Sequence, residues 1–189
     1  MSRWPPREEM QARILQTTDR LFYEQGIRAT GVDAVAGEVG ISKRTLYDYY
    51  PSKEDLIAAY LSRRLIDIEI TDRPPREQIL GVFDQLERTL GRKRFRGCAF
   101  VNAVAELGGE VREVSSLAVA FKERRRQWFR ELLSRLAVDD ADTLSMQLAV
   151  LLDGAIAAGL VRGDPAFVRA ARDAAATLID ARRRGKARR

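Results

Sequence analysis

The segment GISKRTLYDYYPSKEDL, residues 40–56, has the composition of a short helix with a chemically active surface. It opens with a glycine, places Lys, Arg, Thr and three Tyr within one helical stretch, and is then interrupted by a proline before a serine. A helix that only packs against a core would be more apolar, and an ordinary solvated helix would carry fewer aromatic side chains. This mixture suggests a helix whose exposed face contacts something charged.

Local signals define the ends of the helices in this segment. Gly40 permits a tight turn with positive φ after one short helix, and Ser42 can cap the next one. Pro51 stops that helix, because proline removes a backbone donor and restricts the residue before it. Ser52 with Asp55 has the spacing of a capping box that opens a further helix.

Helical spacing of apolar residues extends along the whole chain, and no segment shows convincing strand alternation. Thr30 with Asp33 also has capping-box spacing. We therefore predict an all-α protein with about nine helices. They are expected to cover approximately residues 7–25, 30–39, 43–49, 53–70, 76–90, 98–107, 110–136, 140–160 and 165 onwards.

Composition excludes several classes of chemistry. Histidine is absent, which removes His-based acid–base catalysis, Ser-His or Cys-His nucleophile pairs and His metal ligands. Cys98 is the single cysteine, so no intrachain disulfide or cysteine cluster can form. Since no paired-carboxylate motif is present either, we predict a protein that is not an enzyme and has no metal or cofactor.

The net charge of +6 has a local origin. The final nine residues contain six basic side chains and no acidic one, so the remainder of the chain is neutral, 6 − 6 = 0. We interpret residues 184–189 as a disordered basic tail. No signal peptide is visible, and the apolar run 144–161 contains Gln147 and Asp153, which favours a buried helix over a membrane span. We expect a cytoplasmic protein without a membrane partner.

The helix expected over residues 43–49 has two faces. Leu46 and either Tyr49 or Tyr50 point inward, whereas Lys43, Arg44 and Tyr47 point outward. An arginine can donate twice to guanine O6 and N7, and a tyrosine hydroxyl suits a phosphate oxygen. On residue types alone, a DNA contact and a plain solvated surface remain equally supported.

The stretch ILQTTDRLFYEQGIRATGVDAVAGEVGISKRTLYDYYPSKEDLIAAYL, residues 14–61, resembles the DNA-binding domain of the tetracycline-repressor (TetR) family of bacterial transcriptional regulators. The matching features occur in order: Phe and Gly closing the first helix, Thr before the second, VA…VGIS through the turn, TLY, and PSKEDL. The resemblance implies a helix-turn-helix DNA-binding domain over residues 7–52 and a ligand-binding and dimerisation domain over residues 53–183.

The same resemblance implies which residues contact DNA. Tyr47 and Lys53 would hold phosphates, and Lys43, Arg44 and Thr45 would meet base edges. Arg44 stands where the family often has Gly, and Tyr49 where His or another polar residue is frequent. The implied DNA-binding residues are Thr30, Ser42, Lys43, Arg44, Thr45, Tyr47, Tyr49 and Lys53.

The composition of the last two helices indicates a homodimer, because small side chains let helices of two chains approach closely. A protein with two-fold symmetry also presents two recognition helices. The alternative is an intramolecular core. The predicted interface residues are Leu148, Leu152, Ala155, Gly159, Phe167, Ala171, Ala174 and Leu178.

A small-molecule pocket is expected among the fourth to seventh helices. Asn102 and Glu106 follow Cys98 at i+4 and i+8, a polar line that could orient a ligand or bond other helices. Of these two interpretations we favour the second. The candidate pocket residues are Phe83, Phe100, Asn102, Val104, Glu106, Phe121 and Trp128.

Together these patterns predict a homodimeric, ligand-responsive transcriptional regulator. We expect it to be a repressor that binds a palindromic double-stranded DNA operator and is released from it by an unidentified small-molecule effector. A sequence-independent DNA-coating protein and a helical enzyme are the alternatives from other classes. The coating protein would show steep salt dependence with little preference among sequences.

Overall fold

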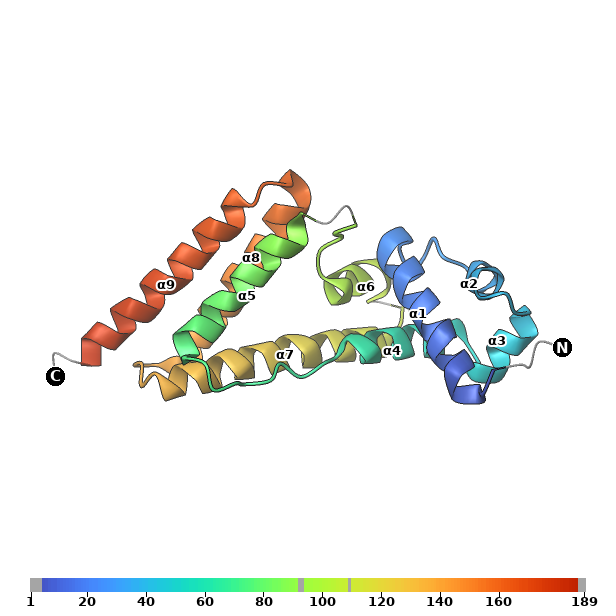
Figure 1. The fold of residues 1–189 in the computed structure, drawn as a ribbon, viewed down its shortest axis with the longest axis horizontal. Coiled ribbons are helices and arrows are strands. Elements are labelled where there is room, and N and C mark those ends of the chain that lie inside the picture. The colour runs from blue at the N-terminus through green and yellow to red at the C-terminus, as the bar shows by residue number, and fades with distance from the viewer. Residues whose placement is uncertain (1–4, 92–93, 109, 187–189) are drawn as a thin grey trace. The chain divides into compact units, whose positions relative to one another are not determined.

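Helices form all the regular secondary structure in the described part of the chain (Figure 1). The computed structural model describes residues 5–91, 94–108 and 110–186, and within these residues it contains nine helices and no strand. The prediction of an all-α chain with about nine helices is confirmed. The helices are α1 (Arg7–Gln25), α2 (Val32–Val39), α3 (Lys43–Tyr49), α4 (Lys53–Arg64), α5 (Pro75–Leu90), α6 (Ala99–Leu107), α7 (Arg112–Arg135), α8 (Ala141–Arg162) and α9 (Ala166–Lys186).

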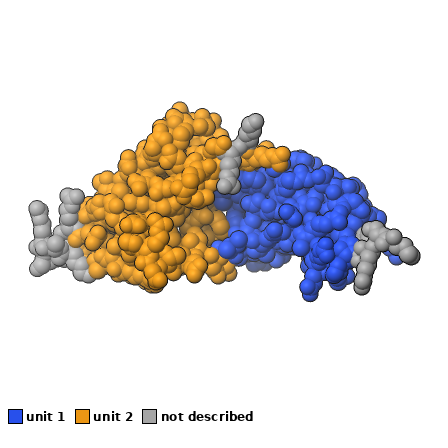
Figure 2. Space-filling view, viewed as in Figure 1, with its two compact units in different colours: residues 1–66, 98–119 blue, residues 67–97, 120–189 orange. Residues whose placement is uncertain are grey.

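The chain divides into two compact units, coloured blue and orange in Figure 2. Unit 1 comprises residues 1–66 and 98–119, and so contains α1 to α4, α6 and the beginning of α7. Unit 2 comprises residues 67–97 and 120–189, with α5, the rest of α7, α8 and α9. The boundary after residue 52 between the DNA-binding domain and the ligand-binding domain stays a prediction, because the two compact units are defined by packing and not by function. Helix α9 includes residues 184–186 of the predicted tail, and the last three residues lie outside the described part.

Serine side chains cap α3 and α4 as the sequence predicts. The Ser42 Oγ accepts a hydrogen bond from the Thr45 N–H at 3.0 Å, and the Ser52 Oγ accepts one from the Asp55 N–H, also at 3.0 Å. Each cap satisfies a backbone donor that the first helical turn leaves without a partner. The start of both helices is therefore fixed by local chemistry.

Two local predictions are wrong. Thr30 does not cap α2, whose N-cap is Gly31 without a side-chain bond; the Thr30 hydroxyl donates instead to the Gly26 carbonyl at 2.7 Å. The helix predicted over residues 53–70 ends at Arg64. Ile66 and Ile68 beyond it are 73% and 39% exposed, so burial does little to offset the low helix propensity of these β-branched residues.

The core of unit 1 joins α1 to α4. Phe22 and Tyr60 meet edge to face with ring centroids 5.6 Å apart, and both are buried. Arg64 donates two hydrogen bonds to Asp19, at 2.6 and 2.9 Å, and its guanidinium lies over the rings of Tyr23 and Tyr60. Burial raises the pKa of Tyr60. These contacts hold α4 against α1 and so fix the helix that begins with Lys53.

The core of unit 2 is formed by α5, α7, α8 and α9. Phe83, Phe129, Leu148 and Ile179, one from each helix, are fully buried in it. Helix α8 packs along α9 and also contacts α5. This arrangement leaves one side of α8 and α9 outside the core of the single chain.

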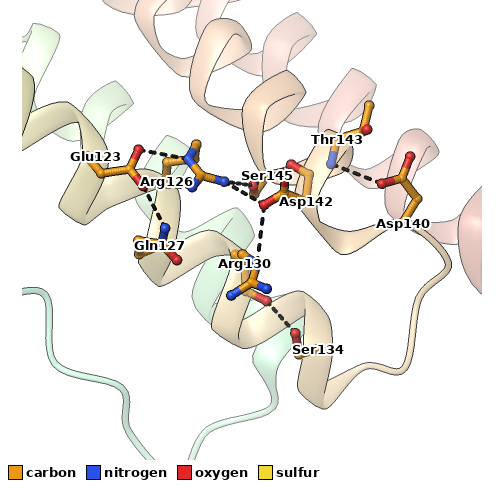
Figure 3. A network of polar contacts seen from close by, with 9 residues as sticks. All are labelled: Glu123, Arg126, Gln127, Arg130, Ser134, Asp140, Asp142, Thr143 and Ser145. Atoms are coloured by element: carbon orange, nitrogen blue, oxygen red, sulfur yellow. Dashed lines mark hydrogen bonds and ion pairs between the residues drawn. The ribbon is translucent and has the colours of Figure 1, made fainter.

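A polar network joins α7 to the start of α8 (Figure 3). Arg126 donates to both carboxylate oxygens of Glu123, at 2.8 and 2.6 Å, and to Asp142 at 2.8 Å. Gln127 donates to Glu123 at 2.6 Å. Two hydrogen bonds, of which the one from Arg126 has the larger effect and the one from Gln127 the smaller, lower the pKa of Glu123 to about 2. Arg130 lies 3.3 Å from the same Asp142, so two arginines one turn apart on α7 hold the beginning of α8.

Helix α8 is the helix in the described residues that is long and apolar enough to cross a membrane by length and composition. Core helices of globular proteins meet the same criterion. Only 33% of an apolar 18-residue stretch of this helix is buried within the chain, although α8 packs on α5 and α9. The helix therefore presents apolar surface that the single chain does not cover.

Candidate nucleic-acid interface

A glycine corner sets the geometry between α2 and α3. Gly40 adopts φ 79° and ψ 35°, and the N–H groups of Gly40 and Ile41 donate to the Ala36 carbonyl at 2.9 and 3.0 Å. This left-handed conformation costs glycine little and other residues considerably more. Ala36 and Leu46 are buried on either side of the corner, so the two helices cross closely. The arrangement is a helix-turn-helix, as the sequence predicts.

Helix α3 separates an inward from an outward face. Leu46 is fully buried, and Tyr50 rather than Tyr49 is the aromatic residue that enters the core. The hydroxyls of Ser42 and Thr45 lie 2.8 Å apart and bond each other. The short helix is thus held by its inward face and its cap, which leaves its other face available.

Lys43 begins α3 and is paired within the unit. Its Nζ donates to the Asp33 carboxylate of α2 at 3.0 Å. This hydrogen bond, together with the nearby negative charge, raises the pKa of the Lys43 ammonium. Both side chains are exposed, so the pair is accessible to solvent and to a docked polyanion.

Arg44 and Tyr47 form the open part of the outward face. Both are exposed, Tyr47 by 37%, and neither makes a side-chain hydrogen bond or ion pair within residues 5–91, 94–108 and 110–186. A planar guanidinium with several donors and a phenol hydroxyl on a rigid ring therefore remain available for an external partner. This pair has the chemistry for a base edge and a phosphate.

Tyr49 is supported by the first helix. The guanidinium of Arg7 lies 4.7 Å from the centre of the Tyr49 ring, and the same side chain donates to the Asp48 carbonyl at 3.1 Å. A cation over an aromatic face is a favourable contact. Arg7 is not predicted from the sequence, since no local pattern connects residues 41 positions apart.

Lys53 and Thr30 both contact the connection between α1 and α2. The Lys53 ammonium donates to the Ile27 carbonyl at 2.7 Å and keeps further donors. Thr30 is buried and its hydroxyl bonds the Gly26 carbonyl, so this side chain is committed to the inside of unit 1. Thr30 is therefore not among the accessible side chains of this interface.

The predicted pocket residues are divided between the two compact units. Phe100, Asn102, Val104 and Glu106 belong to α6 in unit 1, whereas Phe83, Phe121 and Trp128 belong to unit 2. Phe100 and Phe83 are fully buried core residues, Val104 is exposed, and Arg125 lies over the Phe121 ring.

Glu106 is occupied inside unit 1. Its carboxylate accepts a hydrogen bond from the Arg28 backbone N–H at 2.8 Å, and its backbone carbonyl accepts one from the Arg28 Nε at 2.7 Å. The structure thus supports the interpretation that Glu106 bonds another segment of the chain, and we do not assign it to a ligand pocket.

Unit 2 contains a recess of about 570 Å³. Its walls come from residues 68–73, α5, α7 and α8, and of the predicted pocket residues it includes Trp128. The Trp128 indole Nε1 is buried and has no hydrogen-bond acceptor among the described residues. In the described residues no three acidic or cysteine side chains gather where they could hold a metal ion.

Half of the predicted dimer residues lie in the core of unit 2. Leu148, Leu152, Ala155 and Gly159 are buried, so this face of α8 is not available to a second chain, which corrects the prediction. Helix α8 is apolar on every side, and its pattern therefore does not indicate which side is outside. The large exposed apolar residues of α8 are Met146, Val150, Leu160 and Val161.

The α9 residues of the predicted interface are placed differently. Phe167 is exposed, and Ala171, Ala174 and Leu178 are half-buried. This edge of α9 is therefore accessible, and its role in a dimer stays a prediction.

The helix-turn-helix, with its exposed cationic helix and the additional helical unit, defines a DNA-binding transcriptional regulator. Residues 14–60 match the family of bacterial regulatory proteins of the TetR type. A TetR transcriptional regulator from Streptomyces avermitilis is 30% identical, over 88% of this chain and 97% of that one, with a TM-score of 0.74. This chain belongs to the TetR family, which consists of DNA-binding regulators rather than enzymes.

Two further relatives extend the similarity. A TetR-family transcriptional regulator from Streptomyces coelicolor is 28% identical, with a TM-score of 0.82, and the match covers 93% of this chain and 97% of that one. A helix-turn-helix regulator of Mycobacterium tuberculosis is 29% identical over 160 residues, covering 71% of this chain and 79% of the relative. The likeness thus extends well beyond the helix-turn-helix.

Proposed function

We propose that this protein is a cytoplasmic, homodimeric repressor that binds a palindromic DNA operator and is released from it by a small molecule. The observation that carries the proposal is the outward face of α3, where Arg44 and Tyr47 are exposed and have no hydrogen-bond partner within the described residues. In a major groove, Arg44 donates to guanine O6 and N7, with Lys43 and Thr45 at neighbouring base edges. Tyr47, Tyr49 and Lys53 hold phosphates, and the capping Ser42 places the helix N-terminus near the backbone.

The proposed dimer uses the uncovered side of α8 and the accessible edge of α9. Val150 and Val161 are 71% and 83% exposed, and Phe167 lies nearby in sequence at the start of α9. Large exposed apolar side chains that gather on paired helices are typical of a protein–protein interface. A symmetric pair of chains presents two α3 helices, and these contact successive major grooves about 34 Å apart.

The proposed effector binds in the recess of unit 2. Its volume of about 570 Å³ lies within the range of small-molecule sites, and apolar walls from Trp128, Leu152 and Ile156 are combined with charged residues at α5. An effector that binds more tightly to a conformer unable to span both half-sites lowers the affinity for the operator. By linkage, the operator lowers the affinity for the effector by the same factor.

Selection of bound fragments from random duplex DNA tests the proposal directly. The expected result is a palindromic consensus, bound by the wild-type chain at least about a thousandfold more tightly than unrelated duplex. Binding with equal affinity to all fragments and a steep salt dependence would identify the chain as a DNA-coating protein instead. A reporter gene placed behind the selected sequence distinguishes repression from activation.

A further inference from the structure

Three residues between α1 and α2, Gly26 to Arg28, are bound from two sides within unit 1. On one side the Lys53 Nζ donates to the Ile27 carbonyl at 2.7 Å. On the other side the Glu106 carboxylate accepts the Arg28 N–H at 2.8 Å. The Ile27 carbonyl and the Arg28 N–H belong to one peptide group, so this group is bonded both to the first residue of α4 and to a residue of α6.

The Glu106 carboxylate also lies directly over Gly26. A Cβ at Gly26 would be 3.3 Å from Glu106 Oε2, and the residue has φ +96°, a conformation that glycine tolerates and L-side chains rarely adopt. The Arg28 guanidinium completes the contact, since its Nε donates to the Glu106 backbone carbonyl at 2.7 Å and it forms an ion pair with Glu110. Glu106 therefore bonds Arg28 on one side of Ile27 and lies close to Gly26 on the other.

This arrangement affects Lys53 through its own geometry. A lysine side chain has four rotatable bonds, and ordering it on a phosphate costs conformational entropy. The bond to Ile27 uses one of three ammonium donors and leaves two. A carbonyl held in place limits the positions of the ammonium before DNA arrives, which reduces the cost of binding.

We propose that Glu106 is a positioning residue for the phosphate contact of Lys53, acting through the Gly26–Arg28 segment. The inference rests on the proposed DNA-binding function and adds a residue 53 positions away from the lysine that it serves. Glu106 does not touch DNA in this proposal. Its effect on operator affinity exists only while Lys53 is present.

A double-mutant cycle on the full-length chain tests this relation, with the duplex selected by the wild-type chain as the probe. Lys53→Ala should lower affinity about tenfold, evenly across sequences, and reduce the slope of log K against log[salt] by about one. Glu106→Ala should lower affinity about three- to tenfold in the wild-type background and less than about 1.5-fold in the Lys53→Ala background. Glu106→Gln keeps an oxygen for the Arg28 N–H and should restore most of the affinity.

Glu38→Ala is the matched control, because it removes a carboxylate of unit 1 that pairs with Arg20 and not with Lys53 or with residues 26–28. Its effect should be equal in both backgrounds, and thermal unfolding of each variant shows whether it folds. Equal losses from Glu106→Ala with and without Lys53, or no loss at all, would overturn the inference while DNA binding stands. An unchanged affinity in Lys53→Ala would also overturn it. If the wild-type chain selects no sequence, the proposed function itself fails.

Discussion

The Lys43 ammonium lies 3.0 Å from the Asp33 carboxylate, so a basic residue of the proposed DNA contact is bound by an acidic side chain of the neighbouring helix. Both residues are exposed, with 49% and 72% of their side chains accessible. DNA must therefore compete with Asp33 for Lys43, and phosphates must approach a carboxylate. The helix-turn-helix contains an internal competitor for its own ligand.

Removal of this competitor should strengthen binding. In Asp33→Asn the Lys43 ammonium loses an ionic partner and the surface loses a negative charge, so we expect operator affinity to rise about two- to fivefold. Fluorescence anisotropy with the selected duplex measures the change. Glu38→Gln is the control, because it removes the same charge from the same helix at a pair with Arg20. An equal gain from both variants would show a general charge effect and no role for the pair.

Substitution of Arg44 should alter sequence preference. Arg44→Ala is expected to lose discrimination at one operator position in each half-site, at a cost of about 1–3 kcal/mol for the preferred base. Repeating the fragment selection with the variant measures this loss position by position. Arg63→Ala removes an exposed arginine of α4 outside the recognition helix and should leave the consensus unchanged. A uniform weakening across all positions would assign Arg44 to the phosphate backbone.

A charge on the uncovered side of α8 should prevent dimer formation. Val150→Lys places an ammonium on a position that is 71% exposed in the single chain, and we expect a monomer in sedimentation velocity and a loss of cooperative operator binding. Val119→Lys makes the same change at a valine of α7 that is 68% exposed and should sediment like the wild type. A dimeric Val150→Lys protein would place the interface elsewhere.

The polar network between α7 and α8 predicts a specific acid sensitivity. The pKa of Glu123 is lowered from 4.5 to about 2 in the folded chain, so ionised Glu123 stabilises the fold above pH 4.5 and this contribution is lost as the pH falls towards 2. Glu123→Gln should therefore lower the urea midpoint near neutral pH and flatten its decline over that interval. The effect is modest, because about half of the side chain is exposed and solvent screens the pair.

The control for Glu123 lies on the same helix. Glu131→Gln removes one carboxylate at an i,i+4 pair with Arg135, 3.1 Å away, outside the network of Figure 3. It should change the pH dependence of the urea midpoint less than Glu123→Gln does. Parallel curves for the wild type and Glu123→Gln between pH 4.5 and 2 would contradict the role assigned to Glu123.

Local sequence was sufficient for the helix-turn-helix. The Gly40 corner, the Ser42 and Ser52 caps and the buried Leu46 all depend on contacts within a few residues or one adjacent helix, and each was predicted correctly. Where a second local partner was available the prediction failed: Thr30 has capping spacing to Asp33, yet its hydroxyl bonds the Gly26 carbonyl. A sequence pattern does not rank two geometrically possible partners.

The sequence by itself determined the helical class, the positions of most helix ends and the outward face of α3, because these follow from periodicity, capping and turn chemistry at short range. Only the tertiary structure decided the partner of Glu106, which contacts Arg28 across 78 residues, and the side of α8 that enters the core. Because α8 has apolar residues on every side, its sequence does not indicate which side is buried. A single carboxylate in a helix likewise does not indicate which residue it will bond. Both depend on which helices pack together, and that is a property of the folded chain.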